Sequence, residues 1–335
     1  MAKYKVVITD REYEDIDNEL RILQELGDVE VLDYQLRDED QVIEIAKDCD
    51  ALIIQYAKAT KEVIGALEHC KVIAKYAIGI DGIDIAEATK KGICVTNVND
   101  YCADEVSTHA AAMLLDTVRR TQEFNARVKA GEWYRMGIKI PSLKHSVIGV
   151  ISFGRIARAY IDKIKPFCDQ IWVFDKFVPE KDMAAYGVLP KSLEEILSGA
   201  DYISIHAPLT EETRHMFDKE AFKMMKPSAS IINVARGALI KEEDLIWALQ
   251  NQEIAFAALD VLETEPPQKD SPLLQFIKGK FISIMVPYFA FCFLTLAIRA
   301  FMLEMPMGEM IAWTRGILSG VRNQVPLAAM WFLPC

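Results

Sequence analysis

The chain has 335 residues, which is long enough for two domains of ordinary size. Its hydrophobic content of 51% and charged content of 26% are typical of a globular protein and exclude an intrinsically disordered one. The net charge is −11 and no block of Lys and Arg stands out, which argues against direct binding to nucleic acid, because neutralising phosphates needs clustered cations.

The N-terminus and the cysteines predict the compartment. The first ten residues are typical of a strand and not of a signal peptide. The seven cysteines contain no C-x-x-C pair, which fits reduced thiols in a cytoplasmic protein, and we expect no metal site. Residues 281–298 lack charge, as a short membrane span would, but Pro287 interrupts them. We therefore expect a buried strand, a pocket loop and a helix start there, with no membrane association.

The first third of the chain alternates strand and helix patterns, which predicts a parallel sheet flanked by helices. The expected strands are 5–9, 29–32, 51–54 and 72–76. A first helix is expected to end at residue 26, and two more are expected over 39–47 and 61–67. A loop with two glycines, 77–82, follows the last of these strands. Its backbone N–H groups could face a ligand, or it could be a simple turn.

A long helical pattern follows over 103–128 and stops at Gly131, and we expect one helix that bridges domains or forms a subunit contact. The second α/β unit begins at Ser146, so the domain boundary is expected near residue 98. Further strands are expected at 202–206, 229–234, 255–261 and 281–285, with a helix over 241–249. Together they predict a doubly wound sheet whose ligand crevice lies at the carboxyl ends of the strands.

The stretch 146–158 is the strongest local signal for a ligand. An apolar strand, a glycine turn at Gly154 and a helix would aim helix N–H groups and the helix dipole at a phosphate. Asp175 ends the next strand, where a dinucleotide fold holds the ribose hydroxyls, and a carboxylate there favours NAD over NADP. The first glycine of the G-x-G-x-x-G/A pattern is replaced by Ser152, which costs roughly 1 kcal/mol if a positive φ is needed. The alternative is an ordinary strand–turn–helix that binds no ligand.

Several segments in a fixed order resemble the NAD-dependent D-isomer-specific 2-hydroxyacid dehydrogenases over nearly the whole chain. The segments are 78–84, 97–106, 205–210, 233–237 and 258–266. The tail is most similar to the D-lactate dehydrogenase branch, and the region 101–105 resembles the C-terminal-binding-protein corepressors.

The resemblance implies two α/β domains with doubly wound parallel sheets. A Rossmann NAD domain would occupy 99–290, and a flavodoxin-like substrate domain would combine 1–98 with 291–335. The active site would lie in the cleft between them, with domain closure excluding water. A homodimer formed through 103–128 is also implied.

The resemblance also assigns roles to residues. Arg236 would bind the substrate carboxylate and carbonyl, because its guanidinium presents two donors in a fixed geometry. The alternative is that Arg236 forms a surface ion pair. Tyr56 and the N–H groups of Ile78 and Gly79 would bind the same substrate. His206 would border the nicotinamide, unless it is a plain core histidine. The remaining cofactor contacts are Ser152, Gly154, Arg155 and Ile156 at the pyrophosphate, Asp175 at the ribose, and Ala207, Pro208, Val234, Ala235, Arg236 and Asp260 toward the nicotinamide.

The sequence departs from the family at the catalytic acid. In the family a glutamate, here Glu265, orients and charges a histidine that protonates the carbonyl oxygen. This chain has Tyr288 where the family has that histidine, and its last histidine is His215. The usual dyad is therefore absent.

Three interpretations of Tyr288 stay open. The phenol could donate the proton, although its ordinary pKa lies about 3.5 units above that of histidine, which raises the barrier by roughly 2 kcal/mol. Reduction of a 2-oxo acid would then suffer less than oxidation. The protein could instead bind NAD(H) as a regulatory protein or pseudoenzyme with little turnover. A different NAD chemistry, such as a lyase or epimerase step, is the third. The apolar residues 286–294 are either core, a subunit contact, or a pocket for a larger apolar substrate side chain.

Overall fold

The structure is a computed structural model that describes residues 4–99, 101–133, 140–267 and 270–273. The chain divides into two compact units. Unit 1 extends to Ser107 and includes Pro208–Thr213, and unit 2 comprises Thr108–Ala207 and the described residues from Arg214 onward. The predicted domain borders at 98 and 291 stay predictions, and the second lies outside the described residues.

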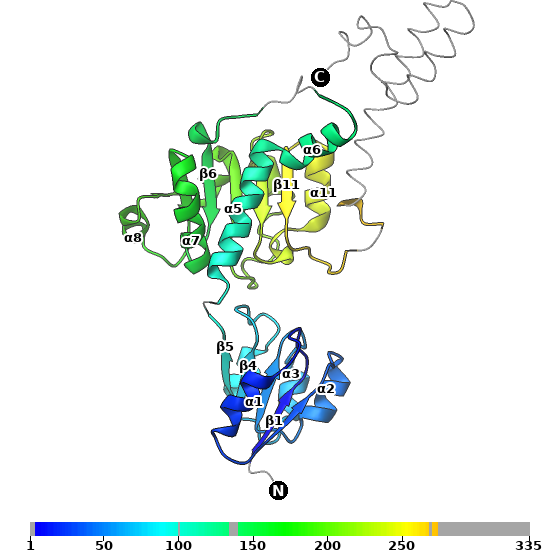
Figure 1. The fold of residues 1–335 in the computed structure, drawn as a ribbon. Helices are drawn as coiled ribbons and strands as arrows, with labels where there is room; N and C mark the ends of the chain where they lie inside the picture. The colour runs from blue at the N-terminus through cyan, green and yellow to red at the C-terminus, as the bar shows by residue number, and fades with distance from the viewer. Residues whose placement is uncertain (1–3, 100, 134–139, 268–269, 274–335) are drawn as a thin grey trace, which may run out of the picture. The chain divides into compact units, whose positions relative to one another are not determined.

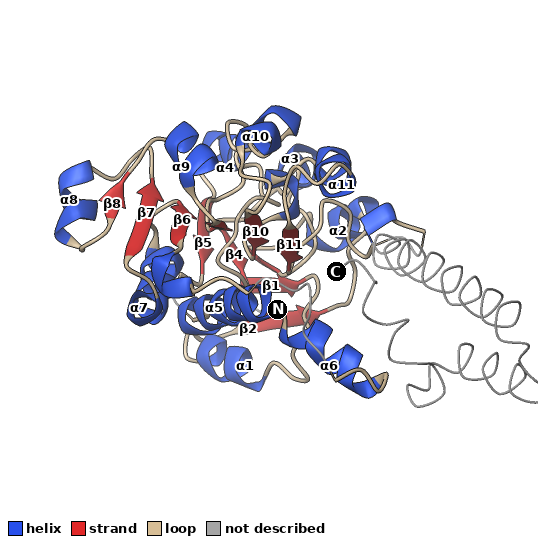
Figure 2. Ribbon diagram, turned by 90° about the horizontal axis from the view of Figure 1, so that it is seen from above, coloured by secondary structure: helices blue, strands red, loops and turns tan. Residues whose placement is uncertain are grey.

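Unit 1, coloured blue to cyan in Figure 1, contains a parallel sheet in the order β2-β1-β3-β4-β5, which is the flavodoxin-like order. Helices α2, α3 and α4 lie on one face of this sheet and α1 on the other (Figure 2). The strands are β1 (Tyr4–Ile8), β2 (Val29–Asp33), β3 (Ala51–Ile54), β4 (Val72–Lys75) and β5 (Cys94–Asn97), and the helices are α1 (Asp17–Gln24), α2 (Glu39–Ala46), α3 (Lys61–Ala66) and α4 (Ile85–Lys91).

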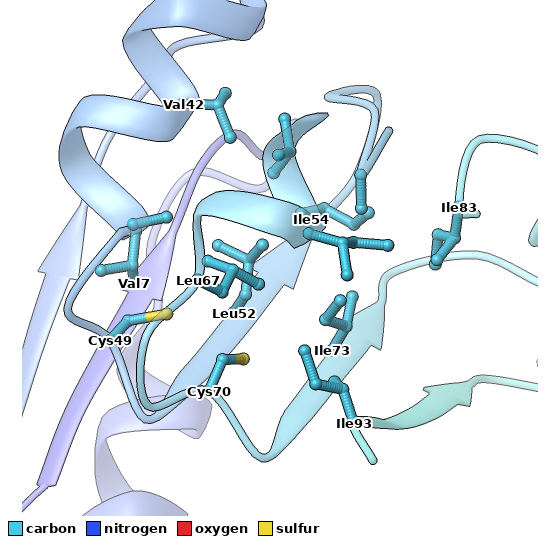
Figure 3. Packing of buried hydrophobic residues seen from close by; sticks show 14 of the residues in the cluster. Val7, Val42, Cys49, Leu52, Ile54, Leu67, Cys70, Ile73, Ile83 and Ile93 are labelled. Carbon is cyan, nitrogen blue, oxygen red and sulfur yellow. The ribbon is translucent and has the colours of Figure 1, made fainter. Parts of the chain in front are cut away.

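The core of unit 1 lies between the sheet and the three helices on one face (Figure 3). Val42 and Ala46 are four residues apart on α2, so both point at the sheet. Alternate strand residues meet them, among them Leu52, Ile54 and Ile73, which are fully buried. Burying these side chains on one face fixes the strand register and therefore fixes where the loops at the carboxyl edge begin.

Unit 2 contains a parallel sheet in the order β8-β7-β6-β9-β10-β11, the Rossmann order 3-2-1-4-5-6. Helices α5 and α7 cover one face and α9, α10 and α11 the other (Figure 2). The strands are β6 (Val147–Ile151), β7 (Gln170–Phe174), β8 (Leu189–Pro190), β9 (Tyr202–Ile205), β10 (Ser230–Asn233) and β11 (Phe256–Leu259). The helices are α5 (Ala103–Arg119), which belongs to unit 2 from Thr108 onward, α6 (Thr121–Lys129), α7 (Arg155–Ile164), α8 (Glu180–Ala185), α9 (Leu193–Gly199), α10 (Lys219–Met224) and α11 (Glu242–Gln250).

The predicted fold class is confirmed, because both units are doubly wound parallel sheets with helices on both faces. The predicted strand at 281–285 lies outside the described residues. In the part of the chain that the structure describes, no helix is long and apolar enough to cross a membrane. The uncharged stretch 281–298 lies beyond that part.

The prediction of one helix over 103–128 is wrong. Helix α5 ends at Arg119, and Arg120 adopts a left-handed conformation (φ 52°) before α6 begins. Asp116 stabilises the break, because its carboxylate accepts hydrogen bonds from the Thr121 hydroxyl and from the Gln122 N–H (3.2 Å). The Gln122 N–H belongs to the first turn of α6 and has no partner within the helix. The apolar spacing continues through the break, which is why the sequence pattern does not reveal it.

Candidate functional site

The predicted cofactor residues form a row along the carboxyl edge of the unit 2 sheet. Strand pairing aligns Phe174 with Ile151, Ile151 with Ile205, Ile205 with Asn233, and Asn233 with Leu259. The residues that follow these strand ends therefore lie side by side, in the order Asp175, Ser152, His206, Val234 and Asp260. This is the edge at which open α/β sheets bind ligands.

Gly154 and the start of α7 provide room for a phosphate. Gly154 precedes the first residue of α7, and no side chain caps the helix. A Cβ added at Gly154 would meet no atom of the described residues within 4 Å, and the φ of −73° at this position suits any residue. Neither packing nor conformation requires glycine here, so the open space favours the close approach of a pyrophosphate to the backbone and to the first N–H groups of α7. The side chains of Arg155 and Ile156 start at the same turn.

Asp175 is held by the turns around it. Its Oδ2 accepts from Phe153 N (2.7 Å) and Ser152 Oγ (3.2 Å), and its Oδ1 accepts from Phe177 N (2.8 Å) and Val178 N (3.0 Å). Burial raises the pKa of Asp175, but these hydrogen bonds outweigh it and hold the pKa below its ordinary value. The carboxylate is therefore ionised at neutral pH, as a ribose acceptor requires.

Ser152 occupies the turn in a left-handed conformation, with a φ of 81°. The position thus needs the positive φ that glycine adopts most easily, as the dinucleotide pattern predicts. The strain that serine accepts, roughly 1 kcal/mol, is offset in part by its hydrogen bond to Asp175.

The loop after β10 fixes the backbone around Arg236. The buried side chain of Asn233 accepts from Ala235 N (3.0 Å) and donates to Arg236 O (2.9 Å). Arg236 is half-buried, and its Nη1 donates to Ala235 O (2.8 Å). A Cβ at Gly237 would lie 1.9 Å from the backbone carbonyl carbon of Leu262. Only glycine therefore lets the segment that leads to Glu265 pass beside Arg236.

His206 turns toward the inside of unit 2. Its Nε2 lies 3.0 Å from Ser204 Oγ, and the centroid of its ring lies 4.9 Å from that of Tyr160. Its buried Nδ1 has no hydrogen-bond partner among the described residues. Burial lowers the pKa of His206 to about 3, so the imidazole is neutral at physiological pH. These contacts fit the core-histidine alternative as well as the nicotinamide role, which stays a prediction.

The other predicted residues of unit 2 follow the strands at the same edge. Ala207 and Val234 are buried, and Ala235 is half-buried. Pro208, which follows Ala207 in the chain but belongs to unit 1, is exposed. Asp260 is exposed, and its Oδ1 lies 3.3 Å from His109 Nε2 on α5. Glu265 is exposed and accepts from Leu262 N (2.8 Å). Tyr288 and the apolar segment 286–294 lie outside the described residues.

The predicted substrate residues Tyr56, Ile78 and Gly79 lie at the carboxyl edge of the unit 1 sheet. Tyr56 follows β3, and the buried carboxylate of Asp10 accepts from its backbone N–H (2.8 Å). A hydrogen bond to Glu12 and partial burial raise the pKa of the Tyr56 hydroxyl. The half-buried Ile78 and Gly79 follow β4, and Asn97 donates to Ile78 O (2.6 Å).

Sequence reasoning did not single out Asp10 or His109, and it named Asn233 only as the start of the family segment 233–237, without a role. Asp10 could have been suspected as an acid directly after a strand. No sequence signal indicates His109, because its partner Asp260 is distant in the chain. No group of three or more His, Cys, Asp and Glu side chains that could hold a metal ion occurs among the residues the structure describes.

Comparisons with known proteins agree with this geometry. The family model described as D-isomer specific 2-hydroxyacid dehydrogenase, NAD binding domain, matches residues 111–285. A glyoxylate reductase of Pyrococcus furiosus is 35% identical over 259 residues, which are 75% of this chain and 77% of that protein. The crystal structure of an Aquifex aeolicus D-lactate dehydrogenase complexed with NAD and lactic acid has a TM-score of 0.72 and 28% identity, covering 82% of this chain and 84% of that one.

A D-3-phosphoglycerate dehydrogenase of Methanocaldococcus jannaschii is 38% identical over 272 residues, 81% of this chain. The chain spans about half the length of that relative, 51%. The matched residues include the glycine turn, Asp175 and the Arg236 loop, so the residues present fit the dinucleotide that the domain binds. The chain therefore belongs to the D-isomer-specific 2-hydroxyacid dehydrogenase family and carries that family's NAD-binding domain.

Proposed function

We propose that the protein is an NAD(H)-dependent oxidoreductase that interconverts a 2-oxo acid and a D-2-hydroxy acid. The observation that carries the proposal is the single edge of the unit 2 sheet, where the ionised Asp175 and the open turn at Gly154 stand in one row with the Arg236 loop. When bound, the dinucleotide supplies the hydride acceptor or donor.

Arg236 is the proposed substrate anchor. A guanidinium stays protonated and presents a rigid pair of donors, which matches a 2-oxo acid whose carboxylate and carbonyl lie side by side. Asn233 and Gly237 fix the backbone from which this side chain extends. Tyr56 and the N–H groups of Ile78 and Gly79 are proposed to bind the same substrate from unit 1.

Tyr288 is the proposed proton donor to the substrate oxygen. A phenol is protonated at neutral pH and can donate at once, whereas oxidation of a hydroxy acid needs the scarce phenolate. The protein should therefore work best as a reductase. Glu265 would not assist the phenol, because a nearby carboxylate raises a phenol pKa.

The substrate class follows from the same proposal. The relatives are named for lactate, glyoxylate and 3-phosphoglycerate, so small 2-oxo and 2-hydroxy acids are the first candidates. If residues 286–294 line the pocket, an apolar 2-oxo acid should be preferred. A panel with pyruvate, glyoxylate, phenylpyruvate and 4-methyl-2-oxopentanoate distinguishes these cases. Preference for pyruvate or glyoxylate would contradict the hypothesis that these residues form an apolar pocket.

The test is NADH consumption with this panel by the wild type, Tyr288→Phe, Tyr288→His and Arg236→Lys. We expect Tyr288→Phe to lower kcat on the order of 100-fold, because it removes the proton donor and leaves NADH affinity unchanged. Arg236→Lys should lower kcat/KM by a similar factor, because lysine cannot reproduce the two-pronged contact. Tyr288→His should retain or raise the activity.

Two results would contradict the proposal. Equal rates for the wild type and Tyr288→Phe would remove the phenol from the mechanism. NADH binding by the wild type without turnover on any acid would favour an NAD(H)-binding regulatory protein, above all if Tyr288→His gained activity. A homodimer formed through 103–128 and a cytoplasmic location stay predictions.

A further inference from the structure

Among the residues that the structure describes, four donors contact the Asp175 carboxylate. Ser152 Oγ and Phe153 N occupy Oδ2, at 3.2 and 2.7 Å, and Phe177 N and Val178 N occupy Oδ1, at 2.8 and 3.0 Å. An ionised carboxylate offers about four lone-pair sites. The carboxylate that should receive the ribose is thus saturated by the protein itself.

The four donors differ in how easily they can leave. Three are backbone N–H groups, which the turns after β6 and β7 fix in place. The fourth is the Ser152 hydroxyl, whose bond is the longest of the four and which can turn away by rotation about one side-chain bond. It is present only because serine occupies a left-handed position that favours glycine.

A ribose presents two neighbouring hydroxyl groups, and each needs an acceptor. We propose that the Ser152 hydroxyl occupies, in the empty protein, an acceptor site on Asp175 that a ribose hydroxyl takes when the dinucleotide binds. The Ser152 hydroxyl then competes with a ribose hydroxyl of the adenosine half of NAD(H) for the Asp175 carboxylate. It lowers the affinity for the cofactor while stabilising the turn in its absence.

Backbone strain at Ser152 cannot produce the same effect on binding. If the turn keeps its φ of 81° in both states, the strain is present with and without ligand and cancels from the affinity. Only the hydroxyl changes partners. The hydroxyl and the backbone can therefore be separated by two substitutions, Ser152→Ala, which keeps the Cβ, and Ser152→Gly, which removes both.

The experiment measures dissociation constants for NADH, for ADP-ribose as the adenosine half, and for reduced nicotinamide mononucleotide as the other half. We expect Ser152→Ala to bind NADH and ADP-ribose about tenfold more tightly, the order of one displaced hydrogen bond to a charged group. Binding of the mononucleotide should not change. Ser152→Gly should gain at least as much and keeps the test informative if the alanine variant folds poorly.

A structural role alone would give a different pattern. Empty Ser152→Ala should melt below the wild type, because a hydrogen bond is lost, yet show a larger increase in Tm with saturating NADH. In an Asp175→Ala background, Ser152→Ala should no longer alter ADP-ribose binding. Weaker or unchanged ADP-ribose binding, or an equal gain for the mononucleotide, would overturn the proposal. These readouts need no turnover, so they are independent of the reaction proposed above.

Discussion

Gly154 and Gly237 follow two strands of the unit 2 sheet, β6 and β10, at its carboxyl edge, but they are required for different reasons. At Gly237 an added Cβ would lie 1.9 Å from both the C and the O of Leu262 and 2.4 Å from Glu263 N. At Gly154 it would meet no atom of the described residues within 4 Å. Gly237 is needed by the protein's own packing, whereas Gly154 leaves room for something the protein binds.

Replacing each glycine by alanine should separate these two roles. Gly237→Ala should lower the free energy of unfolding by about 1–3 kcal/mol, because backbone atoms must move to admit the Cβ. Gly154→Ala should leave stability nearly unchanged but weaken NADH binding by about tenfold or more, because the methyl group occupies the approach of the pyrophosphate. Urea unfolding and NADH titration measure the two effects. A Gly154 variant that is destabilised but binds NADH normally would contradict this assignment.

The conformation of a single residue could be predicted from the sequence where its neighbours in the chain determine it. The positive φ expected at Ser152 is present, because the glycine pattern encodes the shape of one turn. The need for glycine at 237 was not predictable, because its partner Leu262 lies far along the chain and no period in the sequence connects them. The four donors on Asp175 likewise come from two separate turns.

At the scale of elements, strands were easier to predict than helix ends. Strand β3 begins and ends where the apolar run does, and the strands expected at 5–9, 29–32, 72–76, 202–206, 229–234 and 255–261 differ from the observed ones by one or two residues at an end. The short strands β5 and β8 were not predicted. Buried parallel strands are short apolar runs between polar loops, so composition marks both ends. The break between α5 and α6 has no such mark, since a single left-handed residue, Arg120, interrupts a continuous helical pattern.

The break at Arg120 should depend on Asp116. Asp116→Ala removes the acceptor for Gln122 N and the Thr121 hydroxyl, and we expect it to lower the free energy of unfolding by about 1 kcal/mol. Asp116→Asn keeps the Oδ1 acceptor and serves as the matched control. We expect it to lower the free energy of unfolding by less than Asp116→Ala does. Chemical unfolding followed by circular dichroism measures both. Equal losses in the two variants would show that charge, and not the cap, stabilises the start of α6.

At the scale of the whole molecule, both units fix the carboxyl edge of their sheet in the same way. In unit 1 the buried Asp10 after β1 accepts from the N–H groups of residues 55–57 after β3. In unit 2 Asp175 after β7 accepts from Phe153 N after β6. The alternation of strands and helices predicted the two parallel sheets. It could not predict these contacts, because they join the ends of strands that are neighbours in space and distant in sequence.

Acid should therefore lower the stability of both units by protonating the carboxylates of Asp10 and Asp175. For both, burial raises the pKa, but hydrogen bonds from neighbouring N–H and hydroxyl groups outweigh it and lower the pKa below the ordinary 3.8. Because the folded-state pKa is the lower one, the stabilisation is fully present above the unfolded-state pKa and is lost as the pH falls through the folded value. Wild-type stability should thus decrease below about pH 4, where the unfolded state binds more protons.

Asp10→Asn and Asp175→Asn should each be less stable than the wild type near neutral pH and lose less stability in acid. An amide cannot take up the proton that the carboxylate binds on unfolding, so the acid slope becomes shallower. Urea unfolding between about pH 6 and about pH 2.5 measures this slope. Asp28→Asn removes the same charge from an exposed position and is the matched control. If Asp10→Asn and Asp175→Asn kept the full wild-type slope, other groups would be responsible for the acid sensitivity.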